Sequence, residues 1–160
     1  MSKPAGPHAP SARILFVGHE ASLTGAPMVL LHLARWLDRS GDFDLHTLLL
    51  NGGPLAPAFA DVSRTEVLSS APPRTALQLL NKLLRRVGLN AWNPAERKLR
   101  QVLNQPWDLL YVNTIPAAIR VESAASPRHP SVFHLHEMAH SIRRFGGAQA
   151  EPFLRHAEAI

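Results

Sequence analysis

The chain has 160 residues, of which 46% are hydrophobic, and it contains no cysteine. This length and composition suit one globular domain that buries about two thirds of its unfolded surface. The absence of cysteine excludes disulfides and thiolate metal sites, and it suits a reducing compartment. No stretch of the sequence reaches the roughly 20 apolar residues that a membrane span needs. We therefore expect a cytoplasmic protein.

The charge balance is basic, with 17 Lys plus Arg against 12 Asp plus Glu. Such a chain attracts phosphate groups, whether in nucleic acid, anionic lipid or nucleotides. The aromatic residues make up only 6% of the chain and do not lie among the basic clusters. Because stacking platforms for single strands need that mixture, we expect no nucleic-acid partner. The alternative is that the basic residues cover solvated helix faces.

Residues 1–12 are rich in Pro, Ala and Ser and lack the apolar core of a signal peptide, so we expect a disordered leader. The domain itself is expected to span residues 13–160. Its first strand is predicted at residues 14–17, a short apolar run. Pro27 suits the first turn of the helix that follows, because its missing N–H needs no partner there.

That first helix is predicted to run to Leu37 and to end at residues 40–42. Its polar positions, His32, Arg35 and Arg39, lie at i, i+3 and i+7, so only a narrow stripe is expected to meet water. Further strands are predicted at residues 45–50, 65–68, 109–112 and 131–135, and further helices at residues 76–87 and 93–103.

Continuous apolar strands that alternate with helices are typical of a parallel sheet covered on both faces. The fold class is therefore expected to be α/β and Rossmann-like, with the strand order 3-2-1-4-5. The sequence ends at or within a helix that opens at residues 151–153. Because a doubly wound sheet usually continues from such a helix into another strand, we expect the chain to be part of a larger protein.

The loop after the first strand is a candidate binding element. Thr24, Gly25 and Ala26 place free backbone N–H groups at a helix N-terminus, where the helix dipole favours an anion. Their small side chains let a phosphate or a sugar approach the backbone. The alternative is a plain strand-to-helix turn with Thr24 as the N-cap. The segment lacks the Gly-x-Gly-x-x-Gly pattern of nicotinamide enzymes, which argues against that class.

Other polar residues also follow predicted strand ends. His19 and Glu20 follow the first strand, and Asn113 and Thr114 follow the strand at residues 109–112. In the expected strand order these two strands are neighbours, so their polar residues should face each other in one crevice. The alternative for each is an ordinary solvated loop residue.

Three histidines raise the question of a metal. His134 and His136 point to one side of a strand, and His140 follows them. Neutral imidazoles suit zinc, but the expected aspartate companions are missing and Glu137 alone does not replace them, so we expect no metal. A second alternative is one packed and one exposed histidine. In a third, His136 donates a hydrogen bond to a bound sugar or phosphate, with Glu137 beside it.

Three segments in this order and spacing carry a resemblance. They read His-Glu-Ala-Ser-x-Thr-Gly-Ala-Pro from residue 19, Trp-Asp-Leu-Leu-Tyr-Val-Asn-Thr from residue 107, and Phe-His-Leu-His-Glu from residue 133. Together they resemble the N-terminal, acceptor-side domain of GT-B glycosyltransferases of the family 4 type, over residues 13–160. The resemblance implies transfer of a sugar from a nucleotide-sugar donor to a carbohydrate or lipid-linked acceptor, with retention of configuration and without a metal or other cofactor.

The resemblance also implies residue roles. The loop at Gly25 would approach the donor phosphates and the acceptor, although the family often has two glycines where this chain has Thr24-Gly25. His136 would lie beside the transferred sugar as the catalytic residue. The donor-binding domain of the family is absent from this sequence, so we expect the isolated chain to fold without transferring sugar. The alternatives are a non-catalytic binding or regulatory module of the same fold, and a metal hydrolase.

The helix predicted at residues 76–87 suggests a second hypothesis. Its Lys82, Arg85 and Arg86 would rest on anionic lipid at the inner face of the membrane while its leucines dip in. The alternative is a packed surface helix.

Overall fold

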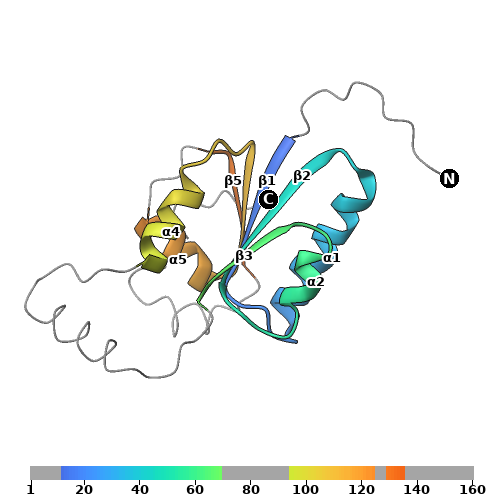
Figure 1. Ribbon diagram of the computed structural model, residues 1–160, viewed down its shortest axis with the longest axis horizontal. Coiled ribbons are helices and arrows are strands. Elements are labelled where there is room, and N and C mark those ends of the chain that lie inside the picture. The colour runs from blue at the N-terminus through green and yellow to red at the C-terminus, as the bar shows by residue number, and fades with distance from the viewer. Residues whose placement is uncertain (1–11, 70–93, 125–128, 136–160) are drawn as a thin grey trace, which may run out of the picture.

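The protein was analysed as a computed structural model that describes residues 12–69, 94–124 and 129–135. Its centre is a five-stranded sheet in which all strands are parallel (Figure 1). The strands are β1 (Ala12–Gly18), β2 (Phe43–Asn51), β3 (Arg64–Ser69), β4 (Leu109–Asn113) and β5 (Ser131–His134). Their order in the sheet is β3-β2-β1-β4-β5. The predicted α/β class and strand order are therefore confirmed.

Four described helices cover the two faces of the sheet. In Figure 1, α1 (Gly25–Ser40) and α2 (Ala56–Ala60) lie to the right of the sheet, and α4 (Pro94–Leu103) and α5 (Ile115–Ala124) lie to the left. Successive side chains of a strand point to opposite faces. In β1, Phe16 packs in the core under α1 and α2, and Leu15 and Val17 pack in the core under α4 and α5. Both cores must be dry, which explains why the strands are apolar without alternation.

The helices differ from the prediction in two respects. The outer face of α1 is wider than the predicted polar stripe, because Trp36 is 65% exposed and Val29 is 44% exposed. The sequence reading also missed α2 and α5. Of the predicted helices, residues 93–103 correspond to α4, whereas residues 76–87 lie outside the described residues. Ala12, predicted to belong to the leader, is the first residue of β1.

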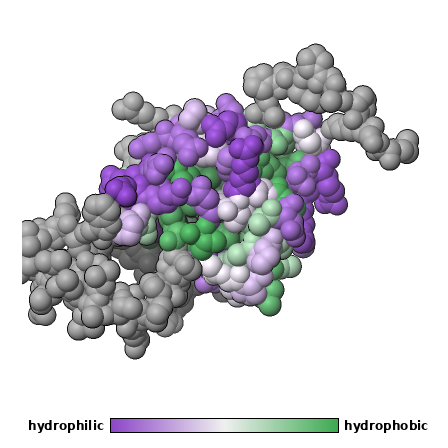
Figure 2. All heavy atoms as spheres, in the orientation of Figure 1, coloured by the Kyte–Doolittle hydropathy of each residue, from purple (hydrophilic) through white to green (hydrophobic). Residues whose placement is uncertain are grey.

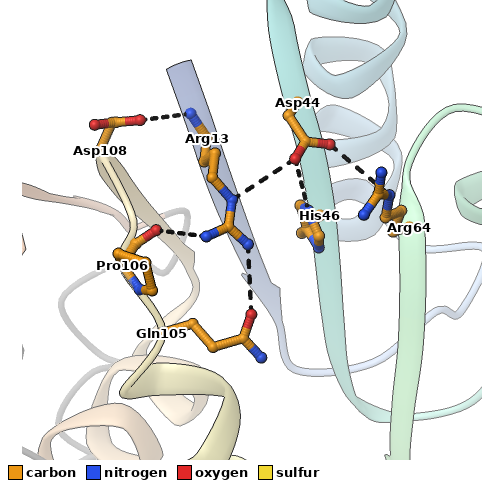
Figure 3. A network of polar contacts seen from close by, with 7 residues as sticks. All are labelled: Arg13, Asp44, His46, Arg64, Gln105, Pro106 and Asp108. Carbon is orange, nitrogen blue, oxygen red and sulfur yellow. Dashed lines mark hydrogen bonds and ion pairs between the residues drawn. The ribbon is translucent and has the colours of Figure 1, made fainter. Parts of the chain in front are cut away.

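A polar network ties the strands together at their amino ends, the edge of the sheet opposite the candidate residues (Figure 3). The carboxylate of Asp44 in β2 lies 3.6 Å from the Arg13 Nε, 3.2 Å from the His46 Nε2 and 3.9 Å from the Arg64 Nε. Arg13 of β1 also donates to the carbonyl oxygen of Pro106 at 2.9 Å. These contacts join β1, β2, β3 and the turn before β4, and so help to fix the strand register.

The described surface is mixed in character. In Figure 2, hydrophilic side chains cover the upper part of the visible face and apolar ones gather near its middle. The edge strand β3 lies in that middle region in Figure 1, and its Val67 is partly exposed. Among the helices that the structure describes, none combines the length and the apolar character needed to cross a bilayer.

Candidate functional site

The carboxyl ends of β1 and β4 form the topological switch point of the sheet. The two strands are neighbours, and Gly18, the last residue of β1, pairs with Asn113, the last residue of β4. From there the chain continues into α1 on one face and into α5 on the other. Because the two connections diverge, they leave a crevice between them, which is where open α/β sheets bind ligands.

A cavity of about 240 Å³ lies at this point, and we call it the rim cavity. It is lined by His19, Glu20, Thr24, Ala26, Pro27, Asn113, Thr114 and Pro116. The segment after β1 and the segment after β4 thus share one cavity. Of the predicted binding residues, His19, Thr24, Ala26 and Asn113 lie together there, and Gly25 is exposed between Thr24 and Ala26. His136 and Glu137 lie outside the described residues.

The loop after β1 is ordered by its own side chains. The Ser22 hydroxyl donates to the Glu20 carboxylate at 2.6 Å and lies 2.8 Å from the Thr24 hydroxyl. Thr24 is the N-cap residue of α1, yet its side chain makes no capping bond. One of the usual targets of an N-cap hydroxyl is the third helical N–H, and here that residue is Pro27, which has none. The Thr24 hydroxyl therefore belongs to the loop and to the wall of the cavity.

The backbone at the start of α1 offers hydrogen-bond donors. The first intrahelical bond runs from the Met28 N–H to the Thr24 carbonyl at 3.3 Å. The N–H groups of Gly25 and Ala26 precede that bond, and helix N–H groups at these positions have no intrahelical acceptor. A β-carbon added to Gly25 would meet nothing within 4 Å. The loop therefore leaves room for a ligand beside two donors and the positive end of the α1 dipole.

Asn113 has a structural contact in the free protein. Its side chain is buried, with 1% of the residue exposed, and its Nδ2 donates to the Ala26 carbonyl oxygen at 2.9 Å. This bond joins the end of β4 to the first turn of α1, two segments that are far apart in the sequence. Asn113 thus positions the two walls of the rim cavity, and its predicted role in binding a ligand stays a prediction.

His134 also has an internal partner. The Tyr111 hydroxyl of β4 hydrogen-bonds the His134 Nδ1 of β5. The two rings lie edge to face, with their centroids 5.8 Å apart. The predicted metal alternative combined His134 with His136 and His140, and those two lie outside the described residues. Within the described part of the chain, no group of three His, Cys, Asp or Glu side chains could hold a metal ion.

Tyr111 is the only tyrosine of the chain, so its ionisation can be followed by absorbance without interference from other tyrosines. Burial raises the pKa of the Tyr111 phenol above its ordinary value of about 10. The folded state therefore holds the phenolic proton more tightly than the unfolded chain does. We expect the free energy of unfolding to fall as the pH rises above about 10, because the unfolded tyrosine ionises first.

The measurement is the absorbance of tyrosinate during an alkaline titration of the folded protein and of the urea-unfolded chain. The folded midpoint should lie at the higher pH. In Tyr111→Phe, this contribution to the alkaline loss of stability should disappear. Equal midpoints, or a lower midpoint in the folded protein, would contradict the burial of the phenol.

A second cavity, of about 320 Å³, adjoins the first on the side of α4 and α5. It shares His19 and Pro116 with the rim cavity and reaches Arg120 of α5, whose guanidinium pairs with Glu96 of α4 at 3.0 Å. Sequence reasoning missed both Pro116 and Arg120, because it did not predict α5. The signal that could have found them is the run of alanine and branched apolar residues after Pro116.

Comparison with known proteins does not assign the chain to a family. No family model matches the chain, nor does any curated protein or any solved structure.

Proposed function

We propose that the chain is the acceptor-side domain of a retaining GT-B glycosyltransferase, which passes a sugar from a nucleotide-sugar donor to a carbohydrate or lipid-linked acceptor. Two observations support the proposal. The three sequence segments resemble that family in order and spacing, and the five-stranded parallel sheet suits its Rossmann-like domain. The observation that carries the proposal is the rim cavity, which two of the three segments build together.

The chemistry of the rim cavity suits binding more than it suits leaving-group stabilisation. His19, Glu20 and Thr24 offer donors and acceptors for hydroxyl groups, and the described residues that line the cavity include no Arg or Lys. Retaining transfer from a nucleotide sugar needs positive charge or hydrogen-bond donors aimed at the departing phosphate. In this proposal most of that charge comes from a donor-side domain, and His136 acts beside the transferred sugar.

Chemical-shift mapping tests the proposal. The isotope-labelled chain is titrated with a panel of UDP- and GDP-sugars and with the corresponding free monosaccharides. We expect saturable shifts centred on residues 19–26 and 113–116, and no sugar transfer by the chain alone. Absence of saturable shifts, or shifts centred on the amino ends of the strands around Asp44, would overturn the assignment. Robust transfer would show that the chain is a complete enzyme.

A second candidate, a non-catalytic binding module, is favoured by one observation. The walls of the rim cavity come from a single Rossmann-like unit, so binding needs no second domain. The same titration separates the two candidates. Tighter binding of a sugar when it is linked to a nucleotide favours the transferase, whereas equal binding of the linked and free sugars favours the module.

Peripheral membrane contact through Lys82, Arg85 and Arg86 stays a prediction, since these residues lie outside the described ones. Co-sedimentation with vesicles of zwitterionic lipid, with and without anionic lipid, tests it. Recovery in the pellet should rise with the anionic fraction, and recovery that does not depend on it would contradict the contact.

A further inference from the structure

Thr114 links β4 to α5 at the wall of the rim cavity. Its N–H donates to the His134 carbonyl at 3.0 Å, and its carbonyl accepts the first helical bond of α5, from the Ala118 N–H, at 3.0 Å. The backbone of Thr114 is therefore held at both ends, by the neighbouring strand and by the helix that it caps. Thr114 is one of the residues that line the cavity, and only 9% of it is exposed.

This backbone is strained. Thr114 has a φ angle of 86°, and within the described residues it is the only non-glycine residue with a positive φ. That region is unfavourable for a β-branched side chain, because the Cβ substituents crowd the backbone. Such strain persists only where the surrounding structure imposes it, and strained residues of this kind cluster at ligand sites.

The hydroxyl of Thr114 carries a second unfavourable feature. Its Oγ1 is buried, and in the described part of the chain it has no hydrogen-bond partner. A threonine at an N-cap normally bonds the N–H of the second or third helical residue. The second residue of α5 is Pro116, which has no N–H. The hydroxyl is therefore neither a cap nor solvated, and a buried hydroxyl without a partner destabilises the folded state.

Both unfavourable features lie at one residue and at one cavity. We propose that the Thr114 hydroxyl is a ligand-contacting group of the rim cavity, and that it bonds a hydroxyl group of an uncharged sugar ring. The inference rests on the proposed function and names the part of the substrate that the cavity takes. With the cavity empty, the Oγ1 is covered and has no partner in the described part of the chain, so the Thr114 side chain must turn toward a bound ring, which then supplies the partner.

The composition of the cavity favours the sugar ring over a phosphate. Among the described residues of the lining there is no Arg or Lys, and Glu20 supplies a carboxylate, a group that accepts hydrogen bonds from hydroxyls and repels an anion. Ala26, Pro27 and Pro116 supply apolar surface for the C–H face of a ring. The carboxylate accepts hydrogen bonds, the Thr114 hydroxyl both donates and accepts them, and the wall is apolar. Together these three features match a sugar ring with several hydroxyl groups.

The first arm of the test measures thermal unfolding without any ligand. Thr114→Val removes the hydroxyl and keeps the branched shape, so the melting temperature should stay the same or rise. Thr114→Gly relieves the strain and should raise it by about 2–4 °C. The matched control is Thr47→Val. Thr47 is also buried, with 1% of the residue exposed, but its hydroxyl bonds that of Ser63 at 2.7 Å, so loss of that hydroxyl should lower the melting temperature by a similar amount. A comparable fall in Thr114→Val would overturn the proposal, because it would reveal a structural hydrogen bond.

The second arm measures affinity for free monosaccharides, for the UDP- and GDP-sugars, and for inorganic phosphate. Thr114→Val should weaken binding of the sugars about five- to tenfold, and Thr114→Ser, which keeps the hydroxyl, should restore it. Thr47→Val should bind as the unmodified chain does. Unchanged sugar affinity in Thr114→Val, or a wild-type chain that binds phosphate in preference to every sugar, would overturn the inference. If sugars cause the same saturable chemical-shift changes at residues 19–26 in Thr114→Val as in the unmodified chain, this inference is overturned and the proposed function still stands.

Discussion

Asn113→Asp should destabilise the protein by about 3 kcal/mol or more at neutral pH. The amide of Asn113 is almost fully buried and donates to the Ala26 carbonyl at 2.9 Å. A carboxylate cannot donate, so it would set a buried negative charge against that carbonyl, and replacing a buried donor by a buried charge costs about 3 kcal/mol or more. The free energy of unfolding, measured by urea denaturation, gives the value directly.

The pH dependence of this variant follows from the same contact. Burial should raise the pKa of the introduced carboxyl, and its protonated form can donate to Ala26 again. The destabilisation should therefore shrink as the pH is lowered. Asn104→Asp is the matched control, because it adds the same charge at an exposed position after α4 and should change stability by less than about 0.5 kcal/mol. Equal stability of the two variants would show that β4 and α1 are not joined through Asn113.

Gly53→Ala is the second substitution with a large expected effect, a loss of about 2–3 kcal/mol. A β-carbon at Gly53 would lie 2.3 Å from the Ala21 carbonyl oxygen and 2.9 Å from the Ser22 nitrogen. Those atoms are backbone, and they cannot easily move away. The Leu55 N–H donates to the Ala21 carbonyl at 2.8 Å, and the Asn51 N–H donates to the His19 carbonyl at 2.9 Å.

The adjacent glycine supplies the control. A β-carbon at Gly52 would meet the side chain of Val67 at 3.6 Å, an ordinary contact, so Gly52→Ala should change stability little. Urea denaturation of the two variants under the same conditions makes the comparison. Because Ala21 and Ser22 belong to the loop that walls the rim cavity, Gly53→Ala should also weaken any ligand binding there. A Gly53→Ala protein as stable as Gly52→Ala would show that the two loops do not touch.

Gly53 illustrates how a correct sequence signal can conceal its cause. The run Asn51-Gly52-Gly53-Pro54 predicts a break after a strand, and β2 does end at Asn51. The sequence does not distinguish the two glycines. Only the packing of this turn against Ala21 makes Gly53 necessary, because the approach of two backbones leaves no room for a side chain.

The helices that the sequence reading missed have identifiable reasons. The helix α2 has only five residues, too few for a helical period to show. The helix α5 begins Ile115-Pro116 without an acidic first turn, and it buries much of its surface, so its sequence carries no amphipathic stripe. Tertiary packing, and not local propensity, holds both of them in place.

Some features of the candidate site could be predicted from the sequence, and others depend on tertiary packing. Sequence reasoning could place His19, Thr24 and Asn113 at one edge of the sheet, because the carboxyl ends of parallel strands meet there. It could not show that the amide of Asn113 turns to Ala26, or that Thr114 has a left-handed backbone and a hydroxyl without a partner in the described part of the chain. Those features depend on where α1 and α5 begin relative to each other.

The sequence by itself determined the α/β class, because continuous apolar strands separated by helices are buried in a parallel sheet with both faces covered. The strand order was expected only as the common order of such sheets, and the tertiary structure has that order. The tertiary structure alone decided which polar side chains hold the fold and which line the cavity. A hydrogen bond between segments about ninety residues apart, such as that from Asn113 to Ala26, exists only after the sheet has brought them together. Residue types near strand ends predict where a site lies. The contacts made on folding decide which hydrogen-bond donors and acceptors remain available to a ligand.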